Sequence, residues 1–232
     1  MQKLLVKVKN FVDCISHIGT NAMKKHYKFD LQNNKYYVRY YKRRCFMIIK
    51  TPRLIFREWS IKDADFVTDG LNDINVAKYL TVPFPYTKQD AIDFIEKHTK
   101  IDDKNFYFAV ERKEDHQIIG GSNIFINEQG EFRGGLWLHR DFQGQGYGTE
   151  IWTARAKFAF DILGAEKLIN TFYDFNERSK KMQLKIGYEI IGEKTNYCPA
   201  LKSSTREIVT RLTKTNFEKY YNSIDFSFLV KE

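Results

Sequence analysis

The sequence is poor in cysteine, proline and histidine, with 3, 4 and 5 residues of these types among 232. The three cysteines (Cys14, Cys45 and Cys198) form no C-x-x-C pair and the histidines lie singly, so a disulfide scaffold and a zinc site are both disfavoured. No apolar run approaches the roughly 18 residues that a membrane span needs. We therefore expect a protein of a reducing compartment, the cytoplasm, with no role in the membrane.

An excess of one charge is missing from most of the chain. The formal net charge is +9, but residues 1–46 hold 11 of the 38 Lys and Arg residues and only 2 of the 29 acidic residues, Asp13 and Asp30. The part from Met47 to Glu232 is therefore neutral overall, which removes the electrostatic reason to expect nucleic-acid binding there. We divide the chain into a basic N-terminal extension, 1–46, and one domain, 47–232.

Several interpretations of the extension stay open. Apolar residues at three- and four-residue spacing predict an amphipathic helix over 2–18, which suits a transit peptide or a membrane-surface helix. Tyrosines among the basic residues 35–44 suit stacking on RNA, although such tracts are more often solvated tails. Alternatively, 1–46 is translated leader and the native product starts at Met47, because Arg43-Arg44 fits the codons of a ribosome-binding sequence.

The most distinctive pattern is the glycine-rich stretch 143–149, which reads Gln-Gly-Gln-Gly-Tyr-Gly-Thr. A strand-like run, 136–138, precedes it, and an amphipathic helix is predicted over 150–163. Glycine permits tight turns and close approach of the backbone, and N–H groups at a helix N-terminus bind anions. The stretch therefore predicts a phosphate or pyrophosphate site, although it lacks the lysine of a Walker loop and the third glycine of a dinucleotide fingerprint.

The flanking sequence predicts alternating strands and helices. Capping boxes start two helices, Ser60 with Asp63 and Thr87 with Asp90. The expected strands are 53–59, 106–111, 118–126, 132–139, 167–173, 187–191 and 205–213, and the other helices are 73–80, 176–186 and a short one with a tail in 215–232. Short turns favour antiparallel pairing, and the long crossover from Leu138 to Lys167 implies a parallel pair. The expected fold is α+β, a mixed sheet with helices on both faces.

Three segments carry a resemblance to a known family. They are Leu136-Trp137-Leu138, the loop Gln143-x-x-Gly146-x-Gly148, and Asn176-x-x-Ser179 followed by Gly187-Tyr188. Together with the order of elements over 47–213, they resemble the GNAT acyl-CoA N-acyltransferases, specifically the RimJ/RimL-like branch. The resemblance implies the GNAT fold and an N-acetyltransferase that uses acetyl-CoA and no metal. It also implies a set of cofactor-binding residues: Leu136, Trp137, Leu138, Gln143, Gly144, Gln145, Gly146, Tyr147, Gly148, Thr149 and Asn176.

The expected chemistry is direct attack of an amine on the thioester, with the Leu138 N–H stabilising the oxyanion. Many family members have a tyrosine where Gln183 stands, so the resemblance makes Ser179 the hydrogen-bond donor to the departing thiolate. The alternative is that Ser179 only favours the first turn of a helix. Relatives often have a glutamate where Arg133 stands, which leaves Glu131 or a water chain as the base. We interpret Glu150 as compensation of the helix dipole.

The acceptor is expected to be a primary amine, either a protein N-terminus, for example of a ribosomal protein, or a small molecule. An α-amine with a pKa near 8 needs less help from a base than a lysine amine near 10.4. The alternative function is a non-catalytic CoA-binding or interaction module on the same fold. A third is an RNA- or ribosome-associated protein that uses 1–46. A homodimer stays an open alternative.

Overall fold

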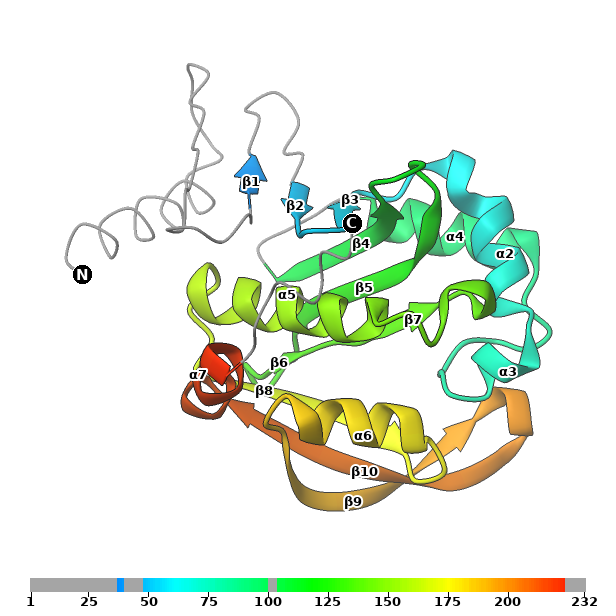
Figure 1. Cartoon of the computed structure of the whole chain (residues 1–232). Helices are drawn as coiled ribbons and strands as arrows, with labels where there is room; N and C mark the ends of the chain where they lie inside the picture. Colours follow the sequence, from blue (N-terminus) through cyan, green and yellow to red (C-terminus); the bar gives the residue numbers. More distant parts are fainter. Residues whose placement is uncertain (1–36, 40–47, 100–103, 224–232) are drawn as a thin grey trace.

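The computed structural model describes residues 37–39, 48–99 and 104–223, which fold around one mixed sheet (Figure 1). The strands are β1 (Tyr37–Arg39), β2 (Ile48–Lys50), β3 (Leu54–Arg57), β4 (Asn105–Arg112), β5 (Ile118–Ile126), β6 (Phe132–Arg133), β7 (Leu136–Leu138), β8 (Lys167–Tyr173), β9 (Glu189–Cys198) and β10 (Ser203–Thr213). The helices are α2 (Ala64–Leu71), α3 (Ile74–Ala77), α4 (Lys88–His98), α5 (Tyr147–Asp161), α6 (Glu177–Lys185) and α7 (Lys214–Ser223), with 3₁₀ turns η1 (Ile61–Asp63), η2 (Arg140–Phe142) and η3 (Pro199–Leu201).

The sheet runs β1-β2-β3-β4-β5-β6-β8-β10-β9, and β7 pairs with β5 beside β6. Every pairing is antiparallel except that of β6 with β8, which is parallel and consists of the single rung Phe132↔Leu168. Within the described ranges, β7 forms no rung with β8, so the two strands separate after that rung. The predicted parallel pair therefore exists, but it closes only one end of the junction between the two halves of the sheet.

Two hydrophobic clusters cover the two faces of the sheet. Leu136 and Leu138 pack into the cluster that surrounds α5, whereas Trp137 packs into the cluster of α2 and α4. Because successive residues of a strand point to opposite faces, α5 covers one face and α2 with α4 covers the other, as Figure 1 shows. The predicted α+β architecture with helices on both faces is confirmed.

Local signals fixed several boundaries correctly. The side chains of Ser60 and Thr87 each accept from the backbone N–H of the acidic residue three positions on. Each N-cap residue donates its own backbone N–H to that residue's carboxylate, so both predicted capping boxes are present. Strands β5 and β8 have the predicted limits, and Asn176 caps α6 as the sequence indicated. Helix α5, by contrast, starts three residues before the predicted Glu150, so Gly148 and Thr149 belong to its first turn.

The predicted continuous strand 132–139 is wrong. It breaks into β6 and β7 at Gly134-Gly135, where the side chain of Asn123 takes the place of a ladder partner and accepts from the Gly135 N–H at 2.7 Å. Gly134 has φ +155°, and an added Cβ would lie 2.1 Å from the carbonyl oxygen of Asn123. The break turns β7 away from the direction that β6 shares with β8.

Part of the N-terminal segment belongs to the sheet. Tyr37–Arg39 forms β1 and pairs antiparallel with β2 at the sheet edge. The predicted amphipathic helix over 2–18 and the rest of 1–46 lie outside the described residues, as do the last nine residues of the predicted C-terminal tail.

Candidate active site

The glycine loop connects η2 to α5, and two of its glycines need conformations that other residues rarely adopt. Gly144 has φ +78° and Gly146, the N-cap of α5, has φ +81°. This left-handed turn brings the loop into the start of a 15-residue helix. The first N–H groups of a helix have no intrahelical partner and carry partial positive charge. The loop therefore ends at a helix N-terminus, the feature on which the predicted anion site at residues 144–149 depends.

Gly148 lies where three elements meet. A Cβ added to it would lie 3.4 Å from Sδ of Met182 on α6 and 3.7 Å from Cδ1 of Leu138 on β7. The first turn of α5 thus lies against both the end of β7 and helix α6. Glycine at this position brings the loop, β7 and α6 into one small region.

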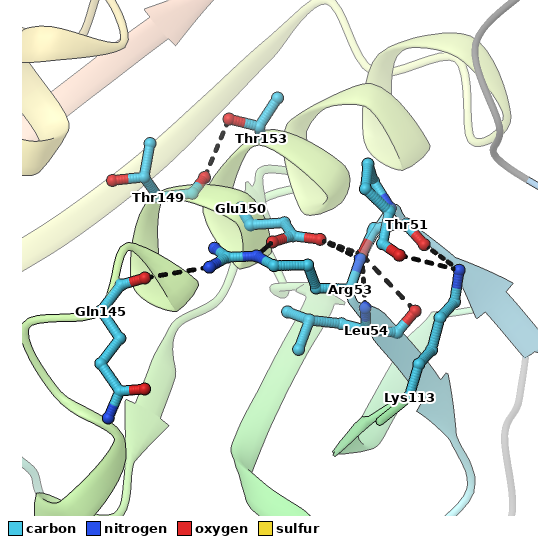
Figure 2. A network of polar contacts seen from close by, with 9 residues as sticks. Thr51, Arg53, Leu54, Lys113, Gln145, Thr149, Glu150 and Thr153 are labelled. Carbon is cyan, nitrogen blue, oxygen red and sulfur yellow. Dashed lines mark hydrogen bonds and ion pairs between the residues drawn. The ribbon is translucent and has the colours of Figure 1, made fainter. Parts of the chain in front are cut away.

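A buried carboxylate anchors the loop to the start of β3 (Figure 2). The side chain of Glu150 is fully buried; its Oε1 accepts from Thr51 Oγ1 at 2.5 Å and from the Arg53 N–H at 2.9 Å. Its Oε2 accepts from Arg53 Nε at 2.7 Å. The same guanidinium donates to the carbonyl of Gln145 at 3.1 Å and lies 4.4 Å from the centre of the Tyr147 ring. Arg53 therefore connects the loop to a strand about 90 positions earlier in the chain.

Glu150 does more than its place in the helix indicates. The sequence places an acidic residue in a first turn, where the dipole interaction is worth about 0.3–1 kcal/mol. In the structure its carboxylate compensates Arg53 and accepts two further hydrogen bonds, so it holds the ends of β3 and α5 together.

The register of β7 determines which backbone groups are free. The N–H of His139 donates to Ile119 on β5 at 2.9 Å, and that of Asn123 donates to Gly135 at 3.0 Å. Because hydrogen-bonded pairs alternate in an antiparallel ladder, Leu136 and Leu138 direct their N–H and C=O groups away from β5. Trp137 directs its own toward β5. Of the three predicted cofactor-binding residues on β7, Leu136 and Leu138 thus face the space between β7 and β8 with their backbone.

A side-chain bridge connects the glycine loop to both sides of this space. Gln143 Nε2 donates to the Leu138 carbonyl at 3.0 Å, and Arg178 Nη1 on α6 donates to Gln143 Oε1 at 2.6 Å. Gln143 therefore takes the acceptor that Leu138 offers beside the strand opening. Arg178 was not predicted from the sequence, because an exposed lysine- or arginine-rich helix face is common and gives no local signal.

At the closed end of the opening, Asn170 replaces a rung of the ladder. In the amide orientation that satisfies its neighbours, its nitrogen donates to the carbonyls of Gly134 at 2.6 Å and Ile169 at 3.1 Å. Its oxygen then accepts from buried Arg155 at 2.7 Å and from the hydroxyl of Tyr188 at 3.2 Å. A polar side chain thus ties the two halves of the sheet where their backbones stop pairing.

The predicted donor Ser179 lies in the first turn of α6, half-buried. Asn176 caps the turn by accepting from the Ser179 N–H at 3.1 Å. The Ser179 hydroxyl accepts from Gln183 Nε2 at 2.9 Å. Ser179 stands between Arg178, which contacts the loop through Gln143, and Met182, which lies against Gly148. The structure therefore brings Ser179 and Asn176 to the same region as the loop.

Glu131 lies elsewhere. Its carboxylate accepts from Asn127 Nδ2 at 3.0 Å in the turn between β5 and β6. Along β5, Ile126 pairs with Phe132 and Gly120 pairs with Leu138, and six residues of a strand span about 20 Å. The structure does not bring Glu131 to Leu138 or Ser179, and its placement gives no support to a role as base.

Aromatic side chains and a buried carboxylate lie on β7, β8 and the strand next to β8. The indole of Trp137 stacks on Phe66 with centroids 6.0 Å apart. Tyr173 ends β8, and its register partner Glu207 is buried, with Lys194 Nζ at 3.1 Å. Burial, with nearby Cys198 and Glu207, raises the pKa of the Tyr173 hydroxyl. That hydroxyl donates to the Tyr197 carbonyl at 3.1 Å and is a poor base.

Among the residues that the structure describes, no group of three or more His, Cys, Asp or Glu side chains could hold a metal ion. No helix among them is long and apolar enough to cross a membrane. Cys198 is buried, with Sγ 3.5 Å from the carbonyl of Lys78.

Comparisons with known proteins agree with this geometry. Residues 53–189 match the acetyltransferase (GNAT) domain family. The chain is 31% identical over 143 residues to the uncharacterized N-acetyltransferase YnaD of Bacillus subtilis (strain 168), a match that covers 61% of this chain and 82% of the relative. Among solved structures, a ribosomal-protein-S5-alanine acetyltransferase from Vibrio fischeri has a similar fold, with 18% identity, a TM-score of 0.60 and coverage of 73% of this chain and 98% of that one. So does a spermidine N-acetyltransferase from Vibrio cholerae, solved with CoA and spermine, with 16% identity, a TM-score of 0.63 and coverage of 71% and 98%. The chain belongs to the GNAT acetyltransferase family and is an N-acetyltransferase.

Proposed function

We propose that this N-acetyltransferase is of the RimJ/RimL-like type and transfers the acetyl group of acetyl-CoA directly to a primary amine in the cytoplasm. One observation carries the proposal. Leu138 directs its backbone away from β5 and lies beside the N-terminus of α5, where Gly148 is close to both Leu138 on β7 and Met182 on α6. This arrangement suits a ligand with a diphosphate at one end and an amide-containing arm at the other.

The cofactor would be bound mainly by backbone groups. The N–H groups of the loop, from Gly144 to Thr149, bind the pyrophosphate at the helix N-terminus. The backbone of Leu136 and Leu138 pairs with the amides of the pantetheine arm, as an added strand would. The Leu138 carbonyl is held by Gln143, so Gln143 exchanges this bond when the arm enters. Asn176 borders the same space from α6.

The reaction needs no covalent enzyme intermediate. The neutral amine attacks the thioester carbon, the carbon–sulfur bond breaks, and CoA leaves as thiolate. The Leu138 N–H stabilises the oxyanion, and one such donor is typically worth about 3–4 kcal/mol. Ser179 donates a hydrogen bond to the departing sulfur. The proton that the amine loses passes to solvent, because Glu131 is remote.

The acceptor is a protein N-terminus or a small amine. Proteins of similar fold include a ribosomal-protein-S5-alanine acetyltransferase and a spermidine N-acetyltransferase, so the fold is compatible with both kinds. Because no side chain is assigned as the general base, an amine that is partly neutral at pH 7 is favoured as the acceptor. An α-amine with a pKa near 8 meets this condition.

The test is thiol release from acetyl-CoA with an acceptor panel: peptides that begin with alanine or serine, spermidine, and a peptide whose only amine is a lysine side chain. We expect turnover with an α-amine peptide and little with the lysine peptide. Binding of acetyl-CoA without turnover on any acceptor would favour the non-catalytic module, and absence of binding by folded protein would overturn the proposal. Ser179→Ala should lower the single-turnover rate about ten-fold or more if its hydroxyl stabilises the leaving sulfur.

A further inference from the structure

Gln183 is fully buried on α6, and both ends of its amide are occupied. Its Nε2 donates to Ser179 Oγ at 2.9 Å, and its Oε1 accepts from Thr210 Oγ1 at 2.6 Å. Thr210 is also fully buried, on β10. The amide therefore connects the first turn of α6 to the sheet. Thr210 Oγ1 also lies 3.2 Å from the Asn170 carbonyl, but its single hydrogen serves the shorter contact to Gln183. A distance of 2.6 Å is ordinary for O–H···O and short for N–H···O, whereas 2.9 Å is ordinary for N–H···O, so the two distances support this orientation of the amide.

The direction of the hydrogen bond to Ser179 matters. A serine hydroxyl has one hydrogen to donate and two lone pairs that accept. Because Gln183 donates to Ser179, the serine hydrogen takes no part in that bond and is available to another acceptor. We infer that Gln183 is a positioning residue, which sets Ser179 as a donor toward the opening between β7 and β8. The inference rests on the proposed role of Ser179.

The surroundings of Ser179 agree with this assignment. Arg178, the residue before it, reaches Gln143 in the glycine loop, and Met182 lies against Gly148. The amide of Gln183 thus bonds the Ser179 hydroxyl on a turn of α6 whose other residues contact the glycine loop. Gln183 cannot itself protonate a thiolate, but it holds the hydroxyl of Ser179, which can donate a hydrogen bond to the thiolate.

Gln183→Glu gives a sharp test. Burial raises the pKa of the carboxyl that Gln183→Glu introduces, so the variant is assayed over a pH series. Where that carboxyl is ionised it only accepts hydrogen bonds, and it would draw the Ser179 hydrogen toward itself. We expect the single-turnover rate of CoA release to fall about ten-fold, while the Kd for CoA and the KM for acetyl-CoA stay within about two-fold. The acceptor is the panel amine with the highest turnover. Gln89→Glu, on exposed α4, is the matched control and should leave the rate unchanged.

A double-mutant cycle separates positioning from general damage. In a Ser179→Ala background, Gln183→Glu should cause no further fall, because the group it positions is gone. A further fall of the same size would overturn the inference. Thr210→Val, which removes the hydroxyl bonded to Gln183 Oε1, is the second variant if Gln183→Glu does not fold; an unchanged rate in a folded Thr210→Val protein would also overturn it.

The proposed function and the inference fail differently. If Ser179→Ala keeps the wild-type rate, the role of Ser179 fails and the inference fails with it. If Ser179→Ala is slow but folded Gln183→Glu is as fast as wild type, only the positioning role is refuted.

Discussion

At the scale of single residues, Glu150 allows two readings of the same side chain to be compared by magnitude. Dipole compensation at a helix start is worth about 0.3–1 kcal/mol, whereas one hydrogen bond to a charged group contributes about 1.5–3 kcal/mol, and the Glu150 carboxylate accepts three. Since the Glu150 side chain is fully buried against Arg53, we expect Glu150→Ala to lower the free energy of unfolding by the larger amount. Urea denaturation measures it.

Glu177→Ala is the matched control for that measurement. Glu177 is also an acidic residue in a first helical turn, on α6, but its side chain is 59% exposed. We expect its loss to cost less than about 1 kcal/mol. If the two alanine variants lose similar stability, the anchoring role of Glu150 is contradicted, and the interaction of its charge with the helix dipole explains the whole loss.

The same residue shows what sequence reasoning lacks at this scale. The glycine loop was located from sequence because its conformation depends on neighbours in the chain, and positive φ at Gly144 and Gly146 is a local requirement. The partners of Glu150, Thr51 and Arg53, stand almost 100 positions away. The role inferred for Gln183 likewise depends on Thr210, which lies on another strand. Roles that depend on distant contacts leave no local pattern.

At the scale of elements, the alternation of hydrogen-bonded pairs along β7 leads to a residue-specific prediction. Leu136 and Leu138 direct their N–H groups away from β5, whereas Trp137 and His139 direct theirs toward it. If the pantetheine arm pairs with β7, CoA should slow amide hydrogen exchange at Leu136 and Leu138 and leave Trp137 and His139 little changed. NMR of the labelled protein with and without saturating CoA measures all four.

Exchange in the loop provides the internal control for that experiment. The amides of residues 146–149 should be protected by CoA in the same samples, because pyrophosphate binding involves them directly. If CoA protects the loop amides but not the Leu138 amide, diphosphate binding at the loop is supported and pairing of the pantetheine arm with β7 is refuted. Equal protection of Trp137 and Leu138 would indicate a general stiffening of β7.

Element boundaries were predictable where a side chain caps its own backbone. Ser60 and Thr87 started their helices as the capping boxes indicated. The break between β6 and β7 falls at Gly134-Gly135, a pair that weakens a strand, and the Asn123 side chain on the neighbouring strand bonds the backbone there. The opening between β7 and β8, on which the proposed site depends, is therefore a property of paired strands and cannot be read from one strand.

At the scale of the whole molecule, a charge network joins the first elements of the domain and gives a pH prediction. Arg57 on β3 donates to Asp63 of η1 at 2.8 Å and to Glu111 on β4 at 2.8 Å, and His116 in the next turn contacts Glu111 at 2.7 Å. Burial raises the pKa of Glu111, but the hydrogen bonds from Arg57 and His116 outweigh it, and the net pKa is lowered from 4.5.

A lowered folded-state pKa means that Glu111 contributes stability above its unfolded value near 4.5, and that this contribution is lost as the pH falls through the lower folded value. We expect Glu111→Gln to be about 1–3 kcal/mol less stable than wild type at pH 7. The difference should shrink as the pH falls below the ordinary value of 4.5 and through the lowered folded-state pKa of Glu111. Denaturant unfolding across this range tests it.

Asp65→Asn serves as the control in the same series. Asp65 pairs with Lys88 at 2.6 Å, but the two side chains are 80% and 60% exposed, and such pairs contribute about 0–1 kcal/mol. Its effect should be small at every pH. A Glu111→Gln difference that grows on acidification would contradict the sign derived from the lowered pKa.

The basic N-terminal segment can be separated from the domain by experiment. Residues 1–46 carry the whole net charge of +9, yet only Tyr37–Arg39 is described there, paired with β2 at the sheet edge. The neighbouring core residue Ile49 remains in a protein that starts at Met47 and is 4% exposed in the full chain. Losing a three-residue edge strand should cost about 1–3 kcal/mol, because its backbone hydrogen bonds to β2 are lost. The glycine loop, β7 and α6 do not pair with this strand, so the proposed site should be retained.

We therefore expect the 47–232 protein to keep the turnover of the full chain with acetyl-CoA and the best acceptor, with a Tm several degrees lower at most. Affinity for single-stranded RNA, if the full chain shows it, should fall with salt and be absent from the shorter protein, because the neutral domain offers no excess of cations to release counterions. Both proteins are titrated with one fluorescent oligonucleotide at two salt concentrations. RNA binding by the 47–232 protein would place a nucleic-acid surface on the acetyltransferase domain itself. Loss of turnover in a folded 47–232 protein would instead make the N-terminal segment part of the active enzyme.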